Sequence, residues 1–323
     1  MTSKQKADGK PSKKKEENKM KKILTLILAA AMACMSVFAL GSCGGGDNLS
    51  AAYDKIVAQY DFDDTGLETL TVAMSPDFAP MEFVDLAKKG DDQYVGFDVI
   101  LAKYLAKELN MKLVIDPMSF DACMAAVSTG QADLAISGFS WTAARAETFL
   151  ISDYYVAGEN ESDQILISTT AKKANFAADK SDFTGLKIGA QGGSLQELLV
   201  TEQLVTKGAE MELYKDLNTA VEALKSGEID ALAVAKGNGE AFVASSDTVA
   251  LTDYYFEVEE KYKNNVILLN KADAELLADV NAALAKAMSA DLYDTWYEAC
   301  QIYAEVKTAD QLGYDDEGNK ITE

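Results

Sequence analysis

The chain has 323 residues, more than one ordinary domain, so two lobes are expected. Apolar residues make up 48% of it and the mean hydropathy is −0.08, which indicates a packed, soluble protein. The formal net charge of −22 excludes nucleic-acid binding, because an acidic surface repels phosphates. The sequence contains no histidine, which excludes Ser-His-Asp and Cys-His catalysis and histidine-ligated metal sites.

Residues 1–43 are interpreted as an N-terminal extension and leader. Two lysines at 21 and 22 precede an apolar run over 23–40, and the run ends in Leu40-Gly41-Ser42-Cys43. Small residues before a cysteine resemble the bacterial lipobox, which predicts lipidation of Cys43 and anchoring on the outer face of the cell membrane. The alternative is a transmembrane anchor, since about 18 apolar residues are long enough to span a bilayer. Residues 44–66 are expected to be a tether.

Strands and helices alternate through the next segment. The predicted elements are a strand at 70–74, an extended segment at 81–84, a helix that follows Gly96-Phe97-Asp98 and is capped by Asn110, a strand at 112–115 and a helix from 120 that Gly130 closes. This alternation predicts a parallel sheet, with ligands collecting at the carboxyl ends of its strands. Ser75, Phe120 and residues 138–145 lie at such ends.

The stretch 133–145 is the most informative part of the sequence. A short apolar strand ends at Gly138, and Thr142 is a suitable N-cap for a helix that begins at Ala143. Arg145 then stands where a capping box has Glu or Gln and where the helix dipole disfavours a cation. A bound anion would explain it, with Ser140, Thr142 and the guanidinium converging on one carboxylate. The alternative is a surface arginine on an ordinary helix.

A second lobe is indicated by an internal repeat. Residues 120–133 match residues 217–230 at a constant offset of 97, including the glycine and the aspartate near the end of each. A chance match is the alternative, because this helix–turn–strand unit is common. The other elements expected here are strands at 187–190, 211–214 and 229–234, a helix at 195–205, and loops at 191–194 and 235–239.

The last third is expected to return to the first lobe. A strand at 262–270 precedes two helices, and the aromatics Tyr293, Trp296 and Tyr303 of the second are expected in the core. Outside the leader there are two cysteines. Cys123 lies on an apolar stripe and is expected to be a buried thiol, while a disulfide between Cys123 and Cys300 stays open. Residues beyond about 307 are expected to fray.

Six motifs follow one another between residues 70 and 303: Val-Gly-Phe-Asp-Val at 95–99, Ser-Thr-Gly-Gln-Ala-Asp at 128–133, Ser-Trp-Thr-Ala-Ala-Arg at 140–145, Ser-Asp-Tyr-Tyr at 152–155, Gln-Gly-Gly-Ser-Leu-Gln-Glu at 191–197 and Ser-Gly-Glu-Ile-Asp at 226–230. As a set, in this order, they resemble the bacterial extracellular solute-binding proteins of family 3, the polar amino-acid-binding proteins of ABC importers.

The resemblance implies an α/β fold, a type II clamp like that of periplasmic binding proteins. Two α/β lobes with central mixed sheets are joined by two crossover strands, near 155–164 and 256–261, and ligand closes the hinge between them. Residues 67–157 and 259–306 would form lobe 1, residues 158–258 lobe 2, and residues 307–323 a polar tail.

The resemblance also implies roles for particular residues. Arg145 would hold the ligand's α-carboxylate, assisted by Ser140 and by backbone near Gly138 and Thr142. Phe78 and Phe120 would enclose the aliphatic part of the ligand. Lobe 2 would close with the side chain of Gln191 and the backbone of Gly193, Ser194 and Leu195.

Two positions depart from the family pattern. Ala235 stands where the family usually has a carboxylate for the α-ammonium group, and Ser75 stands at an early acidic position. An unpaired ammonium in a closed cleft is costly. Glu159, Glu161 and Asp163 near the first crossover are candidates to replace the carboxylate, unless they are a solvated loop. The ligand is therefore an amino acid held by a relocated carboxylate or another small carboxylate.

The expected function is capture of such a ligand by a monomeric, lipid-anchored protein and delivery to a membrane permease, with no cofactor, metal or catalysis. One alternative is a dehydratase of the prephenate or arogenate type on the same fold, but the motif positions offer no clear acid or base for it. The other is a sensor that presents its closed form to a membrane receptor.

Overall fold

The computed structural model describes residues 50–155, 162–315 and 317–321. The leader with Cys43 and the crossover residues Glu159 and Glu161 lie outside the described residues. Within the described ranges, no helix is both long enough and apolar enough to cross a bilayer.

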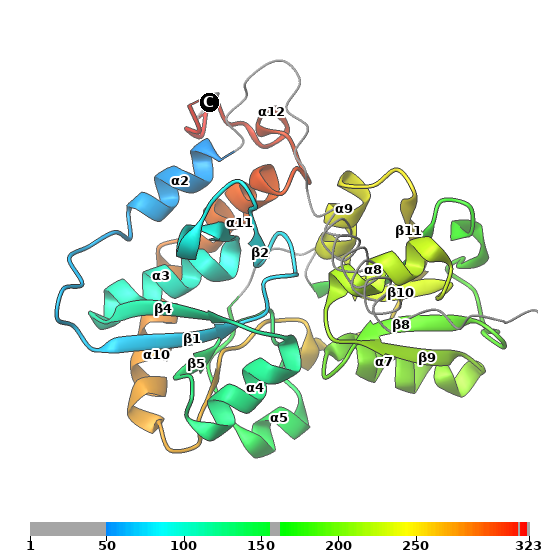
Figure 1. Ribbon diagram of the computed structural model, residues 1–323, viewed down its shortest axis with the longest axis horizontal. Coiled ribbons are helices and arrows are strands. Elements are labelled where there is room, and N and C mark those ends of the chain that lie inside the picture. The colour runs from blue at the N-terminus through cyan, green and yellow to red at the C-terminus, as the bar shows by residue number, and fades with distance from the viewer. Residues whose placement is uncertain (1–49, 156–161, 316, 322–323) are drawn as a thin grey trace, which may run out of the picture. The chain divides into compact units, whose positions relative to one another are not determined.

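The first sheet has five strands in the order β4-β1-β5-β12-β6 (Figure 1). β1 (Thr69–Met74) runs parallel to β4 (Lys112–Pro117) and β5 (Leu134–Ala135), whereas β12 (Leu268–Leu269) runs antiparallel to β5 and β6 (Leu150–Ile151). The sheet is packed with α3 (Phe97–Leu109), α4 (Phe120–Thr129), α10 (Ala274–Ser289) and α11 (Leu292–Tyr303). We call this sheet with its helices lobe 1.

The second sheet also has five strands, in the order β11-β7-β10-β8-β9. β8 (Lys187–Gln191) runs parallel to β9 (Glu210–Tyr214) and β10 (Ala231–Ala235), and β7 (Gln164–Thr169) runs antiparallel to β10 and β11 (Val249–Tyr255). Its helices are α7 (Leu195–Gln203), α8 (Leu217–Ser226) and α9 (Lys236–Ala244). This is lobe 2. The two mixed sheets confirm the expected type II clamp.

The apolar run of β10 explains why helices cover both faces of the second sheet. Ala231 and Ala233 pack with α7, while Leu232 and Val234 pack with α8 and Phe242 of α9. Successive side chains of a strand point to opposite faces, so a strand that is apolar throughout needs cover on both sides. Figure 1 shows α7 on one side of this sheet and α8 and α9 on the other.

The repeat recognised at an offset of 97 is a repeat of structure. α4 and α8 begin at equivalent residues, and each ends before a glycine in the left-handed conformation, Gly130 (φ 71) and Gly227 (φ 81). A left-handed residue after the last turn satisfies otherwise unbonded carbonyls, and glycine adopts it without steric cost. Asn110 (φ 53) ends α3 in the same way, as expected.

The aromatics of the last third lie in the core, as expected. Trp296 is buried against Phe97, with ring centroids 5.8 Å apart, and Tyr293 and Tyr303 belong to the same cluster. Cys123 and Cys300 are buried free thiols, so no disulfide joins them. Burial raises the pKa of both thiols, which keeps them protonated and unreactive.

Two segments differ from the sequence expectation. Of the strand expected at 262–270, only Leu268–Leu269 is a strand, and it follows a short helix at Glu260–Tyr262. Of the loop expected at 235–239, Ala235 is the last residue of β10 and residues 236–239 form the first turn of α9. The glycines there allow close packing rather than a turn, since a Cβ at Gly239 would lie 3.0 Å from the Ile167 side chain.

Both ends of the described chain are packed more firmly than expected. Residues 51–58, inside the segment assigned to a tether, form α2 (Ala51–Ala58), whose buried Ala52, Tyr53 and Ile56 join the lobe 1 core. The tail expected to fray contains α12 (Ala309–Leu312) and the buried Tyr314. The two ends meet, because Lys55 Nζ donates to Asn319 Oδ1 at 2.5 Å.

We expect Tyr53→Ala to destabilise the protein by about 3 kcal/mol, because Tyr53 is 2% exposed and packs against Tyr303 in a tilted arrangement with ring centroids 5.0 Å apart. Urea unfolding would measure this as a lower midpoint at an unchanged slope. The exposed Gln59→Ala should shift stability by less than about 0.5 kcal/mol. Equal stability of the two variants would mean that α2 does not belong to the core.

Candidate ligand-binding site

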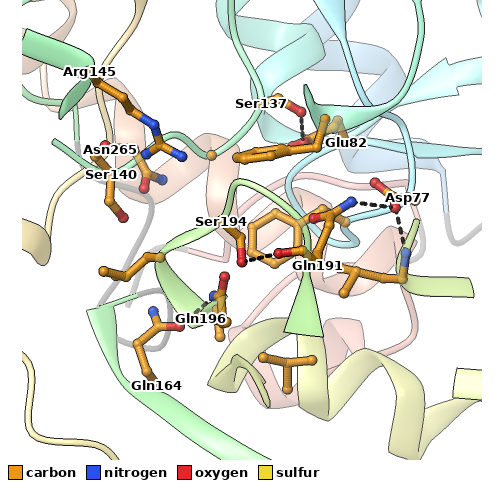
Figure 2. A pocket seen from close by; sticks show the side chains of 17 residues that line it. Asp77, Glu82, Ser137, Ser140, Arg145, Gln164, Gln191, Ser194, Gln196 and Asn265 are labelled. Carbon is orange, nitrogen blue, oxygen red and sulfur yellow. Dashed lines mark hydrogen bonds between the residues drawn. The ribbon is translucent and has the colours of Figure 1, made fainter. Parts of the chain in front are cut away.

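A pocket lies between the carboxyl ends of the parallel strands of the two lobes, as expected for open α/β sheets. Its empty volume is about 540 Å³ when the open space at its mouth is counted. Figure 2 shows the side chains around it. The lining residues are Asp77, Phe78, Glu82, Phe120, Ser137, Gly138, Ser140, Arg145, Gln164, Gln191, Ser194, Leu195, Gln196, Leu217, Val234, Ala235 and Asn265.

Arg145 is the basic residue of the pocket. It lies on α5 (Ala143–Thr148), which begins at the predicted N-cap: the Thr142 hydroxyl accepts from the Arg145 backbone N–H at 3.2 Å. The guanidinium packs over Phe120 and Phe139, 5.6 and 5.1 Å from their ring centroids, and Nη1 donates to the Ser140 carbonyl at 2.5 Å. These contacts fix its direction. Arg145 is therefore not a surface arginine.

In the part of the chain that the structure describes, the charge of Arg145 has no counterion. It is only 5% exposed, yet none of its ion-pairing atoms lies within 4.0 Å of a carboxylate in the described residues. Burial lowers its pKa to about 10, so the group is still positive at neutral pH. A buried, unpaired cation is costly. An anionic ligand would offset that cost.

Most of the residues predicted for the site line this pocket. They are Arg145, Ser140, Gly138, Phe78, Phe120, Gln191, Ser194 and Leu195. The other three predicted residues do not line the pocket, but each is hydrogen-bonded to a residue that does. Thr142 caps α5, the Ser75 hydroxyl donates to Asp77 Oδ1 at 2.9 Å, and the Gly193 carbonyl accepts from Arg145 Nη2 at 2.8 Å.

Several lining residues were not identified from the sequence. Two are acidic, Asp77 and Glu82, and the polar amides Gln164, Gln196 and Asn265 are others. Asp77 had a usable signal, because it lies in the loop that follows the carboxyl end of a predicted strand. Asp163, a candidate replacement carboxylate, is exposed and lies outside the lining.

Asp77 connects the two lobes. Its Oδ2 accepts from Gln191 Nε2 at 3.1 Å and from the backbone N–H of Leu217, the first residue of α8, at 2.7 Å. Burial raises the pKa of this carboxyl to about 6 even though these hydrogen bonds, and one from Ser75, favour the charged form.

A pair of buried acids lies beside the pocket. Glu82 is 1% exposed and Asp98 is fully buried, and neither Glu82 Oε2 nor Asp98 Oδ1 receives a hydrogen bond from a conventional donor in the described chain. The two carboxyls interact instead, and burial raises the pKa of Asp98 to about 7 and that of Glu82 well above its ordinary value. The pair therefore shares one proton at neutral pH.

The acid pair supports the pocket wall. Asp98 Oδ2 accepts from the Gly138 backbone N–H at 2.8 Å and from the Tyr155 hydroxyl at 3.1 Å, where the first crossover begins. Glu82 Oε1 accepts from the Ser137 hydroxyl at 2.5 Å.

Hydrogen bonds between the lobes hold the pocket closed. Arg145 donates to Gly193, Gln191 and Leu217 donate to Asp77, and Asn238 Nδ2 donates to the Ala79 carbonyl at 3.2 Å. In each of them one partner belongs to lobe 1 and the other to lobe 2. Two α/β lobes that close over a charged pocket define a clamp-type binding protein.

Comparison with known proteins agrees with this class. Residues 70–299 match the model of the bacterial extracellular solute-binding proteins, family 3, and the chain belongs to that family. The arginine-binding extracellular protein ArtP of Bacillus subtilis is 28% identical over 265 residues, 82% of this chain and 92% of that protein. A probable histidine-binding protein of Campylobacter jejuni is 27% identical over 227 residues, 70% and 82% of the two chains.

Solved structures of similar proteins have ligands bound. The amino acid ABC transporter substrate-binding protein AbpA of Streptococcus pneumoniae, bound to L-arginine, is 31% identical with a TM-score of 0.64, covering 74% of this chain and 97% of that one. An ancestral arginine-binding protein bound to glutamine is 28% identical with a TM-score of 0.62, covering 71% and 96%. The family consists of binding proteins of ABC transporters, so this protein is not an enzyme.

The shared proton predicts a pH dependence of folding. A pKa raised by folding contributes stability below the ordinary pKa, and this contribution is lost as the pH rises through the folded value, about 7 for Asp98. From pH 5 to pH 8 we expect a loss of about 2–3 kcal/mol from this pair. In Glu82→Gln the amide would donate to Asp98 at every pH, so the decrease in folding stability between pH 5 and pH 8 should be smaller than in the wild type.

Urea unfolding of both proteins across this pH range measures the difference. Other titrating groups cancel in the comparison, so two parallel stability curves would mean that Glu82 and Asp98 do not share a proton.

Proposed function

We propose that this protein binds a free amino acid between its lobes, with the ligand's carboxylate on Arg145. The observation that carries this proposal is a buried guanidinium in a cavity, with no carboxylate partner among the described residues. A planar guanidinium suits a carboxylate because it donates two parallel hydrogen bonds. Arg145 also donates to Gly193 of lobe 2, so the same side chain would contact both the ligand and the opposite lobe.

Other parts of the pocket support an amino acid over a bare carboxylate. The rings of Phe78 and Phe120 offer apolar surface for a side chain. The pair of Glu82 and Asp98 keeps a negative charge beside the pocket, which a positively charged amino group would offset, so the pair would replace the carboxylate missing at Ala235. The relatives named above bind arginine, histidine or glutamine by their descriptions, which supports the same class.

We further propose that the protein is anchored by lipid at Cys43 and delivers its ligand to an ABC permease. The lipobox-like sequence before Cys43 supports the anchor, and the family supports the transporter. The described chain begins with α2 packed on lobe 1, so the residues that follow Cys43 lead directly to a folded lobe.

Arg145→Ala should abolish detectable binding of amino acids, because the variant has no cation for the ligand's carboxylate. Arg145→Lys should weaken binding about 100-fold, since an ammonium cannot make the paired hydrogen bonds. Calorimetry with a panel of the twenty amino acids at neutral pH measures both effects. Wild-type affinity retained in Arg145→Ala would contradict the assignment, and failure of the wild type to bind any of the twenty would contradict the proposed function.

Cys43→Ser should release the protein from the membrane fraction of the expressing cells, because serine carries no thiol for acylation. Fractionation followed by mass measurement would detect this as loss of the lipid mass. Replacing Cys123 with serine is the matched control, since that thiol is buried in lobe 1. Membrane retention of Cys43→Ser would indicate that the apolar run 23–40 is itself the anchor.

A further inference from the structure

The pocket has an excess of negative charge, and a ligand's carboxylate does not account for this excess. Among the lining residues Arg145 is basic, whereas Asp77 and Glu82 are acidic. The acid pair of Glu82 and Asp98 keeps one negative charge after sharing its proton, and the ligand's amino group would offset that charge as its carboxylate would offset the charge of Arg145. Asp77 then adds a further negative charge. An amino acid with a neutral side chain brings no net charge and leaves this excess in place.

Among the described residues, Asp77 has hydrogen-bond donors around it but no cation. Ser75, Gln191 and the first N–H of α8 donate to its carboxylate, and no lysine or arginine of the described chain forms an ion pair with it. The titratable groups that face it are Asp216 at the start of α8, Glu82 and the thiol of Cys123, and none of them is positive.

Asp77 and Arg145 are also well separated. Figure 2 shows their side chains on opposite sides of the pocket, with Gln191 and Glu82 between them. A ligand whose carboxylate rests on Arg145 would direct the far end of its side chain toward Asp77.

We infer that Asp77 is a specificity-determining residue that selects amino acids with a positively charged side chain. This inference rests on the proposed function, because it takes the carboxylate on Arg145 as given. Asp77 is half-buried in the closed clamp, and the hydrogen bonds from lobe 2 offset only part of the solvation that its carboxylate loses. A cationic group beside Asp77 supplies the missing counterion, whereas a neutral ligand leaves the carboxylate without one.

The pH dependence of binding follows from this arrangement. An Asp77 that faces solvent in an open clamp would have an ordinary pKa near 4, whereas burial in the closed clamp raises its pKa to about 6. Closure over a neutral ligand therefore takes up a proton and becomes more favourable as the pH falls from 7 to 5, by about tenfold in affinity. A bound cation keeps Asp77 ionised and removes this dependence.

Arginine and citrulline are the ligands for the test, since they have the same shape and differ in side-chain charge. Calorimetry of the full-length protein at pH 7.5 should show arginine binding at least about tenfold more tightly than citrulline. At pH 5 the ratio of the two affinities should be smaller by up to about tenfold. Asp77→Asn, which keeps an acceptor for Leu217, should weaken arginine binding at least about tenfold and leave citrulline binding equal or tighter. Its arginine-to-citrulline ratio should not change with pH.

Asp121→Asn is the matched control, because it removes the same charge from an exposed site on lobe 1 and should keep the wild-type ratio. Melting temperatures show whether each variant is folded. Equal wild-type affinities for the two ligands, a ratio independent of pH in the wild type, or equal weakening of both ligands by Asp77→Asn would overturn the role of Asp77 and leave the amino-acid site standing. Binding of no amino acid at all would overturn the proposed function and this inference together.

Discussion

The structure depends on one buried positive charge. Arg145 is held by the rings of Phe120 and Phe139 and by the Ser140 carbonyl, and none of these partners neutralises it. In a medium of low polarity such a charge favours an anion strongly. Because Arg145 also donates to Gly193 of lobe 2, an anion bound there would contact the group that joins the lobes.

The acidic groups around the pocket serve two separate purposes. The pair of Glu82 and Asp98 organises lobe 1, since it ties the loop after β1 to Gly138 and to Tyr155 at the start of the first crossover. Asp77 makes its contacts across the cleft instead. The Glu82–Asp98 pair supports the wall of the pocket, whereas Asp77 is bonded to lobe 2 only when the lobes are closed. The charges of these groups are therefore not interchangeable.

The sequence predicted most of the fold because its signals are local. Periodicity and glycine or asparagine caps located α3, α4 and α8, and Thr142 with Arg145 located the centre of the site. The sequence did not predict the features that depend on tertiary packing. The glycines in the first turn of α9 read as a loop because their role depends on packing against Ile167 of a neighbouring strand. Asp77 acts through its contacts with lobe 2, and Glu82 acts through its contact with Asp98. No local pattern contains those contacts.

The packing of α2 against α11 and the C-terminal segment bears on how the clamp moves. The first and last described helices both lie on lobe 1, while lobe 2 is inserted in the middle of the chain through two connections. Lobe 2 therefore contains neither end of the described chain. A lipid attached upstream of α2 would hold lobe 1 still and leave lobe 2 free to rotate, so tethering to a surface need not slow the capture of ligand.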